Sequence, residues 1–86
     1  MRLQLTSRFG RAYAGLTDAE AARVDKTLRL LANDPRYPGL RVKRVQGTEG
    51  IWEARASDSL RITFEMHGDL LILRMVGPHD ATLKNP

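Results

Sequence analysis

The stretch IWEARASDSLRITFEMHGDLLILRM, residues 51–75, decides the fold. Apolar and polar residues alternate in it with a period of two, which is typical of strands that bury one face. The apolar positions fall into three sets: Trp52, Ala54 and Ala56; Leu60, Ile62, Phe64 and Met66; Leu71, Leu73 and Met75. Two short polar breaks separate the sets. The stretch therefore predicts three consecutive antiparallel strands.

The lengths of the two breaks predict which residues pair. A two-residue loop at His67-Gly68 places Arg61 beside Arg74, because glycine accepts the positive φ of such turns. A three-residue loop at 57–59 places Arg55 beside Arg61, whereas a two-residue loop there would turn Arg55 toward the buried face. The prediction is a row of three arginines across three adjacent strands, on the face away from the helices.

A long helix is expected before these strands. Thr17 and Glu20 have the spacing of a capping box, in which each side chain bonds the other residue's backbone N–H. Apolar residues then recur every three or four positions, and charged residues occupy the opposite side. Pro35 disfavours helical geometry in the residue before it. We therefore predict a helix over about residues 18–33.

The remaining N-terminal segments complete the expected architecture. Residues 1–5 alternate like a short strand, and Thr6 or Ser7 can cap a short helix after it. Residues 34–50, rich in Pro and Gly, read as a loop leading into an irregular or short strand. The predicted fold is α+β, in the order β-α-α-β-β-β, with a small antiparallel C-terminal sheet and two helices packed on one face.

Length, charge and cysteine content narrow the class of protein. Eighty-six residues without an internal repeat make one domain, 1–86. The net charge of +4 favours an anionic partner, of which nucleic acid is the commonest. The absence of cysteine fits a reducing cytosol. No signal peptide is recognisable, and no apolar run approaches the roughly 18 residues of a membrane span. We expect a cytoplasmic protein without a membrane partner.

The predicted arginine row points to phosphate. Like charges directly opposite on neighbouring strands cost a few tenths to about 1 kcal/mol per pair. A bound anion would offset that cost, and the planar guanidinium matches phosphate in a bidentate fashion. The alternative is that the arginine side chains splay apart or pair with Glu53, Glu65 or Asp80.

His79 is the candidate proton donor. It follows the last predicted strand in Val76-Gly77-Pro78-His79-Asp80, so it is presented at the edge of the arginine face. Asp80 either orients it or begins a turn. His67, in a turn, is expected to be a solvated loop residue. The chain carries no glycine-rich phosphate loop and no nucleophilic serine or cysteine constellation, and two histidines are too few for a metal cluster.

Four segments together resemble the RelE/ParE toxin superfamily, nearest its RelE, YoeB and YafQ branches. They are Gly50–Arg55, Leu60–Phe64, Leu71–Arg74 and Gly77–Asp80. The resemblance implies a RelE-like fold and a bacterial type II toxin. Its expected activity is that of a metal-free and cofactor-free endoribonuclease that cuts mRNA in the ribosomal A site. The implied partners are a cognate antitoxin, mRNA and ribosomal RNA, with operator DNA bound only through the antitoxin complex.

The resemblance also implies residue roles. Arg61 matches the arginine that holds the scissile phosphate, and His79 matches the C-terminal histidine that acts as general acid. Arg55 matches a basic position on the neighbouring strand, and the predicted register adds Arg74 to this catalytic set. The basic residues expected to contact RNA are Arg36, Arg41, Lys43, Arg44 and Lys84.

Two departures leave alternatives open. The position of the YoeB glutamate base is Gly47, and the C-terminal aromatic of the related branches is absent, with Leu83 where YafQ-type chains have phenylalanine. The carboxylates that remain as a base or an orienting group are Asp80, Glu49 and Glu53. The alternatives to a nuclease are a ParE-type inhibitor of DNA gyrase and a catalytically decayed binding module.

Overall fold

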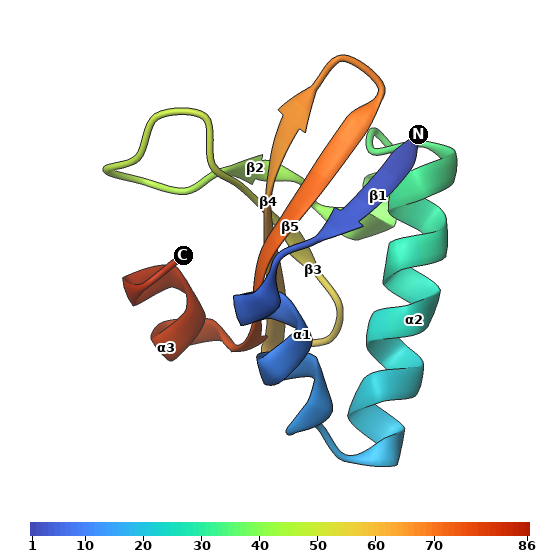
Figure 1. Cartoon of the computed structure of the whole chain (residues 1–86), viewed down its shortest axis with the longest axis vertical. Helices are drawn as coiled ribbons and strands as arrows, with labels where there is room; N and C mark the ends of the chain where they lie inside the picture. The colour runs from blue at the N-terminus through green and yellow to red at the C-terminus, as the bar shows by residue number, and fades with distance from the viewer.

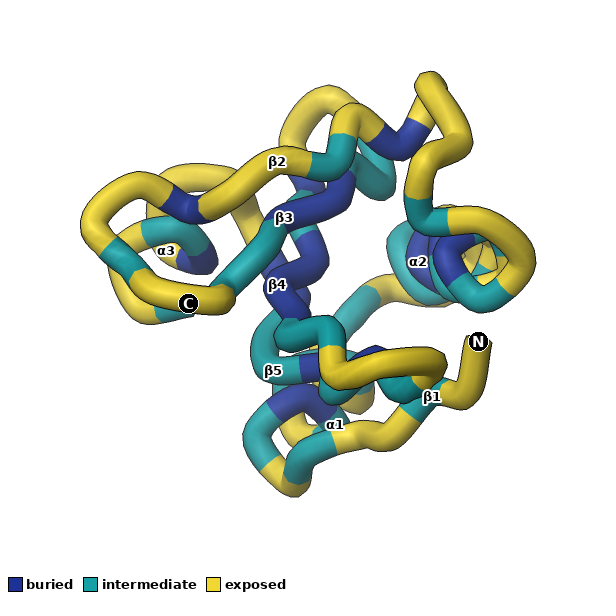
Figure 2. Tube along the Cα trace, turned by 90° about the horizontal axis from the view of Figure 1, so that it is seen from above, coloured by how far each residue is buried: buried dark blue, intermediate teal, exposed yellow.

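The protein folds into a five-stranded sheet with helices on both faces (Figures 1 and 2). The computed structural model describes residues 1–86. The strand order is β1-β5-β4-β3-β2. The elements in chain order are β1 (Arg2–Leu5), α1 (Ser7–Ala14), α2 (Asp18–Asn33), the 3₁₀ turn η1 (Pro38–Leu40), β2 (Lys43–Arg44), β3 (Trp52–Arg55), β4 (Leu60–His67), β5 (Leu70–Pro78) and α3 (His79–Lys84). None of the helices has the length and apolar character needed to cross a membrane.

The two predicted helices are confirmed with their caps. The Thr6 side chain accepts a hydrogen bond from the Phe9 backbone N–H at the start of α1. At the start of α2, Thr17 and Glu20 form both hydrogen bonds of the capping box. These bonds satisfy backbone donors that a helix leaves free at its N-terminus, which is why α2 begins at the predicted residue.

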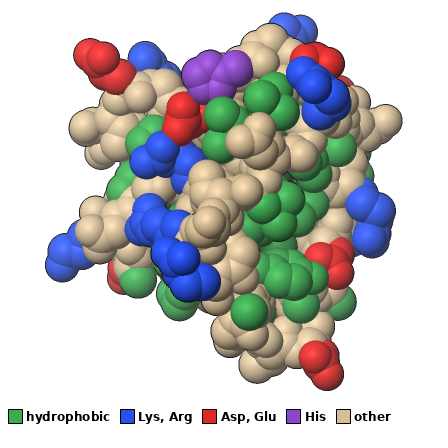
Figure 3. Space-filling view, in the orientation of Figure 1, with side chains coloured by type: hydrophobic (Ala, Val, Ile, Leu, Met, Phe, Trp, Pro, Cys, Tyr) green, Lys and Arg blue, Asp and Glu red, His purple; other side chains and the backbone are tan.

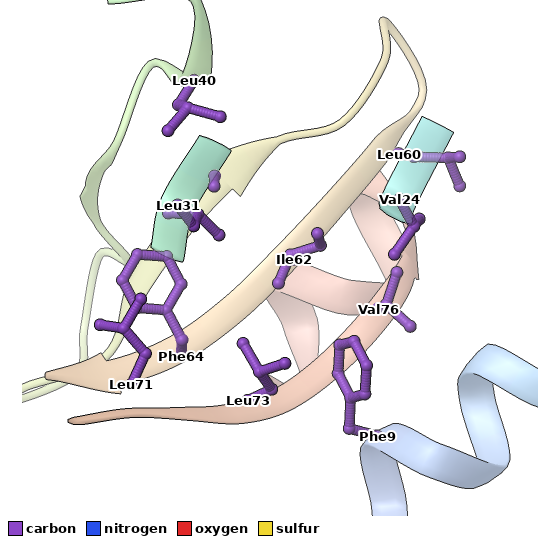
Figure 4. Packing of buried hydrophobic residues seen from close by; sticks show 11 residues of the cluster. Phe9, Val24, Leu31, Leu40, Leu60, Ile62, Phe64, Leu71, Leu73 and Val76 are labelled. Carbon is purple, nitrogen blue, oxygen red and sulfur yellow. The ribbon is translucent and has the colours of Figure 1, made fainter. Parts of the chain in front are cut away.

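The hydrophobic core lies between one face of the sheet and the helices α1 and α2 (Figure 4). The helices contribute Phe9, Val24 and Leu31, which point toward the sheet. The strands contribute Ala54, Leu60, Ile62, Phe64, Leu71, Leu73 and Val76. The prediction that both helices pack on one face is confirmed.

The predicted antiparallel pairing of the three C-terminal strands is confirmed, and the addition of β1 makes the whole sheet mixed. β1 pairs with β5 in parallel, with Leu3 opposite Leu71 and Leu5 opposite Leu73. The Thr6 side chain extends this contact by donating to the Leu73 carbonyl at 2.8 Å. Period-two alternation shows that a segment is a strand, but it carries no information about the direction of its neighbour.

The third helix was not predicted. α3 lies on the face of the sheet opposite α2, as the view in Figure 2 shows, and it contacts β4 and β5. Thr82 is fully buried there, and the Thr63 side chain donates to the Pro86 carbonyl at 3.0 Å. Six residues are too few for an apolar period to be visible, so only the packing reveals this helix.

The register between β4 and β5 is also corrected. The turn residues are Gly68 and Asp69, so His67 pairs with Leu70; Gly68 supplies the positive φ of 60°. The pairing then shifts between Thr63 and Phe64, where Phe64 pairs with Leu73 but Thr63 pairs with Met75. Arg74 is thus the extra residue of a β-bulge, and beyond it the faces exchange. Val76, and not Met75, is the buried residue.

As a result, Arg61 lies opposite Gly77 instead of the predicted Arg74. The other predicted pair is confirmed, because Arg55 lies directly opposite Arg61 across β3 and β4.

Candidate active site

Glu53 is at the centre of the sheet face that carries the two paired arginines. Its carboxylate lies 3.8 Å from Arg61 Nε, and the exposed fractions of the two side chains are 6% and 13%. In the sheet, Glu53 is opposite Lys43 on one side and Thr63 on the other. A carboxylate this buried needs the cations around it, because removing a partner leaves an uncompensated buried charge.

The guanidinium groups of Arg55 and Arg61 are held by the turn between β3 and β4. Arg61 Nη1 donates to the backbone carbonyls of Ser57, at 2.8 Å, and Leu60, at 3.0 Å. Arg55 forms an ion pair with the exposed Asp58. The alternative that the arginines pair with acids holds for Arg61 with Glu53, whereas Asp58 was not among the expected partners. The same contacts fix the two cations side by side instead of letting them swing apart.

A hollow of about 400 Å³ opens over these residues. Four cationic side chains and one carboxylate line it, together with Val42: Arg41, Lys43, Arg55, Arg61 and Glu53. Its excess of positive charge, with guanidinium donors on a rigid sheet, suits a phosphate group. We call it the arginine hollow.

A second hollow, of about 570 Å³, continues from the first and contains His79. It is lined by Lys43, Arg44, Val45, Gln46, Glu53, His79 and Leu83, so the two hollows share Lys43 and Glu53. We call it the histidine hollow. Of the predicted catalytic residues, Arg55 and Arg61 thus lie on one side of Glu53, and His79 lies on the other.

His79 is held through its backbone and through one nitrogen of its ring. Its backbone N–H donates to the Ser59 carbonyl at 2.7 Å, which ties the start of α3 to the turn that holds the arginines. Its Nδ1 lies 2.8 Å from Asp80 Oδ1. An ionised carboxylate only accepts hydrogen bonds, so Nδ1 carries the proton and Nε2 is left for a substrate. The contact with Asp80 thus fixes one edge of the imidazole ring.

Arg74 lies outside both hollows and holds the C-terminal segment. Its Nε donates to the Pro86 carbonyl at 3.2 Å, and its Nη1 pairs with Glu65. Arg8, on α1, donates to the Asn85 carbonyl. Basic side chains accordingly gather between α1 and α3 in Figure 3. The inclusion of Arg74 in the arginine row was wrong because the bulge moved it.

The remaining predicted residues divide between the site and other surfaces. Arg41 and Lys43 line the arginine hollow, and Arg44 lines the histidine hollow and lies 6.0 Å from the centre of the Trp52 ring. Arg36 lines a separate apolar hollow with Trp52 and Met66. Lys84 and Glu49 are exposed and line none of the hollows. No group of three or more His, Cys, Asp or Glu side chains is placed to hold a metal ion.

Glu53 is the carboxylate that the geometry singles out. Among the three candidate bases, it alone lines a hollow. The sequence could have indicated Glu53, because it is two residues before Arg55 on the same strand. The confirmed pairing of β3 with β4 then places it on the same face as the two arginines.

Gly77 and Thr82 set how closely α3 approaches the sheet, and sequence reasoning missed them. A Cβ atom at residue 77 would lie 2.9 Å from Thr82 Oγ1, closer than real Cβ contacts. The Thr82 hydroxyl is buried and has no hydrogen-bond partner. The absence of a side chain at Gly77 thus permits the packing that brings His79 to Glu53.

Gly77→Ala is therefore expected to push α3 away and to lower the rate of the RNA cleavage that the family resemblance implies by up to about 100-fold, because misplacements of about 1 Å cost that much. Adding Thr82→Ala removes the clashing oxygen and should restore most of the rate. Single-turnover cleavage by the two single variants and the double variant measures this coupling. Equal rates for Gly77→Ala and the parent protein would contradict it.

The ionisation of Glu65, which pairs with Arg74, makes the stability of the fold depend on pH. Hydrogen bonds from His67, at 3.0 Å, and from Arg74 hold the pKa of the Glu65 carboxyl below its ordinary value. Because the folded pKa is the lower one, ionised Glu65 stabilises the fold above the unfolded pKa, and this stabilisation is lost as the pH falls through the folded pKa.

We expect the free energy of unfolding to decline as the pH falls below the ordinary glutamate pKa of about 4.3, and Glu65→Gln to flatten that decline. Urea denaturation at a series of pH values measures it. Glu49→Gln removes the same charge from an exposed loop without breaking an ion pair, and it is the matched control. A parent and a Glu65→Gln variant with identical pH dependence would refute the role given to Glu65.

Comparison with solved structures identifies the fold. YafQ from E. coli strain BL21(DE3) superposes with a TM-score of 0.79 over 95% of this chain and 98% of that chain, at 16% identity. A YoeB/ParE toxin from Agrobacterium tumefaciens gives 0.76 over 92% and 99%, at 20% identity. The chain has the RelE/YoeB/YafQ-type toxin fold.

This toxin fold is also found in complexes. The E. coli DinJ–YafQ toxin–antitoxin complex matches with a TM-score of 0.77 over 92% of each chain, at 14% identity. No family model and no curated protein sequence matches the chain. The RelE-like prediction is thus confirmed at the level of the fold, on structural grounds alone.

Proposed function

We propose that this chain is the toxin of a bacterial type II toxin–antitoxin system and cleaves mRNA on the ribosome without a metal ion. The observation that carries the proposal is the junction of the arginine hollow and the histidine hollow at Glu53. It supplies a phosphate-binding group, a proton acceptor and a proton donor in neighbouring positions. These are the groups that RNA cleavage by its own 2′-hydroxyl requires.

The arginine hollow would bind the scissile phosphate. Arg61 and Arg55 are the donors for its non-bridging oxygens, and Lys43 lies between this phosphate and the histidine hollow. As the 2′-oxygen attacks phosphorus, negative charge grows on those oxygens. Guanidinium groups already held by the Ser57 and Leu60 carbonyls and by Asp58 need little reorganisation to stabilise that charge.

The proton transfers would use Glu53 and His79. The Glu53 carboxylate accepts the proton of the 2′-hydroxyl, the new O2′–P bond closes a 2′,3′-cyclic phosphate, and the P–O5′ bond breaks. The departing O5′ takes a proton from Nε2 of a protonated His79, whose Nδ1 stays bonded to Asp80. Exchange of protons with water then restores both residues.

The proposed partners follow from the same fold. The DinJ–YafQ structure is a toxin–antitoxin complex, and we propose that a cognate antitoxin binds this chain, with operator DNA reached only through that complex. The ribosome and mRNA are the targets, which places the activity in the cytoplasm. Contacts to RNA phosphates through Arg41, Lys43 and Arg44 should weaken steeply with salt.

Inducing the chain in a bacterium and mapping mRNA ends tests the function. Growth arrest with cuts in phase with codons is expected for the parent protein, and Arg61→Ala and His79→Ala should abolish both. Arg11→Ala removes an exposed arginine of α1 that lines none of the hollows, and it is the matched control. Circular dichroism confirms that each variant is folded.

The other outcomes point to the alternative functions. Arrest with DNA damage and intact mRNA would indicate a ParE-type gyrase inhibitor. Folded protein that causes no arrest would indicate a binding module that has lost catalysis. Either result would refute the nuclease.

A further inference from the structure

A third hollow, of about 220 Å³, adjoins the arginine hollow at Arg55. Arg55 lines both, as Lys43 and Glu53 line both the arginine hollow and the histidine hollow. The three hollows therefore follow one another around the molecule, from the face of α2 to the start of α3. The third is lined by Arg23, Lys26, Thr27, Leu30, Tyr37, Gly39, Leu40, Arg55 and Ala56.

The third hollow is basic and carries an exposed aromatic ring. Arg23 and Lys26 are exposed residues of α2, and no acidic side chain lines the hollow. Tyr37 is 49% exposed and is one of only three large hydrophobic side chains that the fold leaves open to solvent. The hydroxyl of Tyr37 forms no hydrogen bond within the chain, so the feature that it presents is its ring.

The position of the Tyr37 ring is set by its neighbours. Pro38 follows it and opens the 3₁₀ turn η1. A Cβ atom at residue 39 would lie 3.0 Å from Tyr37 Cε2, so the ring rests over Gly39. An aromatic ring fixed in this way costs little conformational entropy when it binds a flat partner.

We propose that the three hollows form one track for single-stranded RNA, in which Tyr37 stacks on a base at the end opposite His79. The inference rests on the proposed function and extends its substrate site beyond the scissile phosphate. Positive grooves that follow the backbone, combined with aromatic rings for the bases, are how proteins bind single strands without reading sequence. An acidic peptide would use the cations of the track but would gain little from the ring.

Binding of a 2′-O-methyl RNA of about eight nucleotides tests the track. This probe lacks the 2′-hydroxyl and cannot be cut, so its affinity is independent of catalysis. With fluorescence anisotropy at fixed salt, Tyr37→Ala should weaken binding by roughly 5- to 150-fold, the value of one stacked base. Tyr37→Phe keeps the ring and should bind like the parent protein.

The cations of the third hollow have their own control. The double variant Arg23→Gln/Lys26→Gln should weaken binding and lower the slope of log K against log salt by about 1.4, because each phosphate contact to a single strand contributes about 0.7. Arg11→Gln/Arg29→Gln removes the same charge from exposed positions, one of them also on α2, that line none of the hollows. It should keep most of the parental slope.

Three results would overturn the track. The first is that the parent protein does not bind the probe, and the second is that the Tyr37→Ala variant binds it like the parent. The third is that a polyglutamate peptide competes as well as RNA does, and that its binding depends on Arg23 and Lys26 but not on Tyr37. The proposed function fails differently, through intact mRNA in cells. If the parent protein cleaves mRNA and the folded Tyr37→Ala variant binds the probe with normal affinity, the proposed track is wrong but the proposed nuclease function stands.

Discussion

His79→Ala is expected to lower the rate constant of mRNA cleavage on programmed ribosomes by about 10²- to 10⁴-fold, the usual contribution of a positioned general acid. His79 lines the histidine hollow, and its Nε2 makes no hydrogen bond within the chain, whereas its Nδ1 is bonded to Asp80. Without the imidazole, the O5′ leaving group must take its proton from water.

Single-turnover cleavage measures this effect. His67→Ala is the matched control, since the second histidine lies on the β4–β5 turn and contacts Glu65 instead of the site. Asp80→Asn should cost less than His79→Ala, because an amide oxygen still accepts a hydrogen bond from Nδ1–H. A His79→Ala variant within tenfold of the parent would rule out the donor role.

Phe64→Ala is expected to lower the free energy of unfolding by about 3–5 kcal/mol. Phe64 is fully buried in the middle of the sheet, with Trp52 on β3 and Leu73 on β5 as its cross-strand partners. Figure 4 shows its ring among the side chains that the sheet and α2 bring together. Removing the ring loses apolar burial and leaves a cavity that rigid strands on both sides cannot close.

Urea denaturation followed by circular dichroism measures the loss. Tyr37→Ala deletes a ring of similar size from a half-exposed position, and it should cost about 1 kcal/mol or less. The pair separates the effect of burial from the effect of losing an aromatic side chain. Similar costs for the two variants would contradict the core that we describe.

Local signals predicted the parts of this protein whose interactions are close in sequence. The capping box at Thr17 and Glu20 sets the start of α2 through hydrogen bonds three residues apart. The turn at 57–59 sets the pairing of Arg55 with Arg61, because placing a charge in the core would cost far more than any turn preference. The pairing of the two arginines in the arginine hollow was therefore predictable.

The predicted register between β4 and β5 was wrong because an error of one residue in the position of the turn changes every pair along the two strands. Both His67-Gly68 and Gly68-Asp69 are plausible turns, and the bulge at Arg74 added a further step. Together they moved Arg74 out of the arginine row and put Gly77 opposite Arg61. Bulges depend on the packing of both sheet faces, so no local pattern announces them.

The predicted row of three arginines is thus a pair in the structure, Arg55 and Arg61, and Glu53 lies beside it. The sequence by itself determined the strands, the helices α1 and α2, and the pairing of Arg55 with Arg61. Alternation, helix caps and turns determine these features, and each of them acts over a few residues. Only the tertiary structure decided that β1 runs parallel to β5, that α3 covers the second face, and that Glu53 joins the arginines to His79. Those features depend on contacts between segments far apart in the chain, whose energies appear only when the sheet and its helices are packed together.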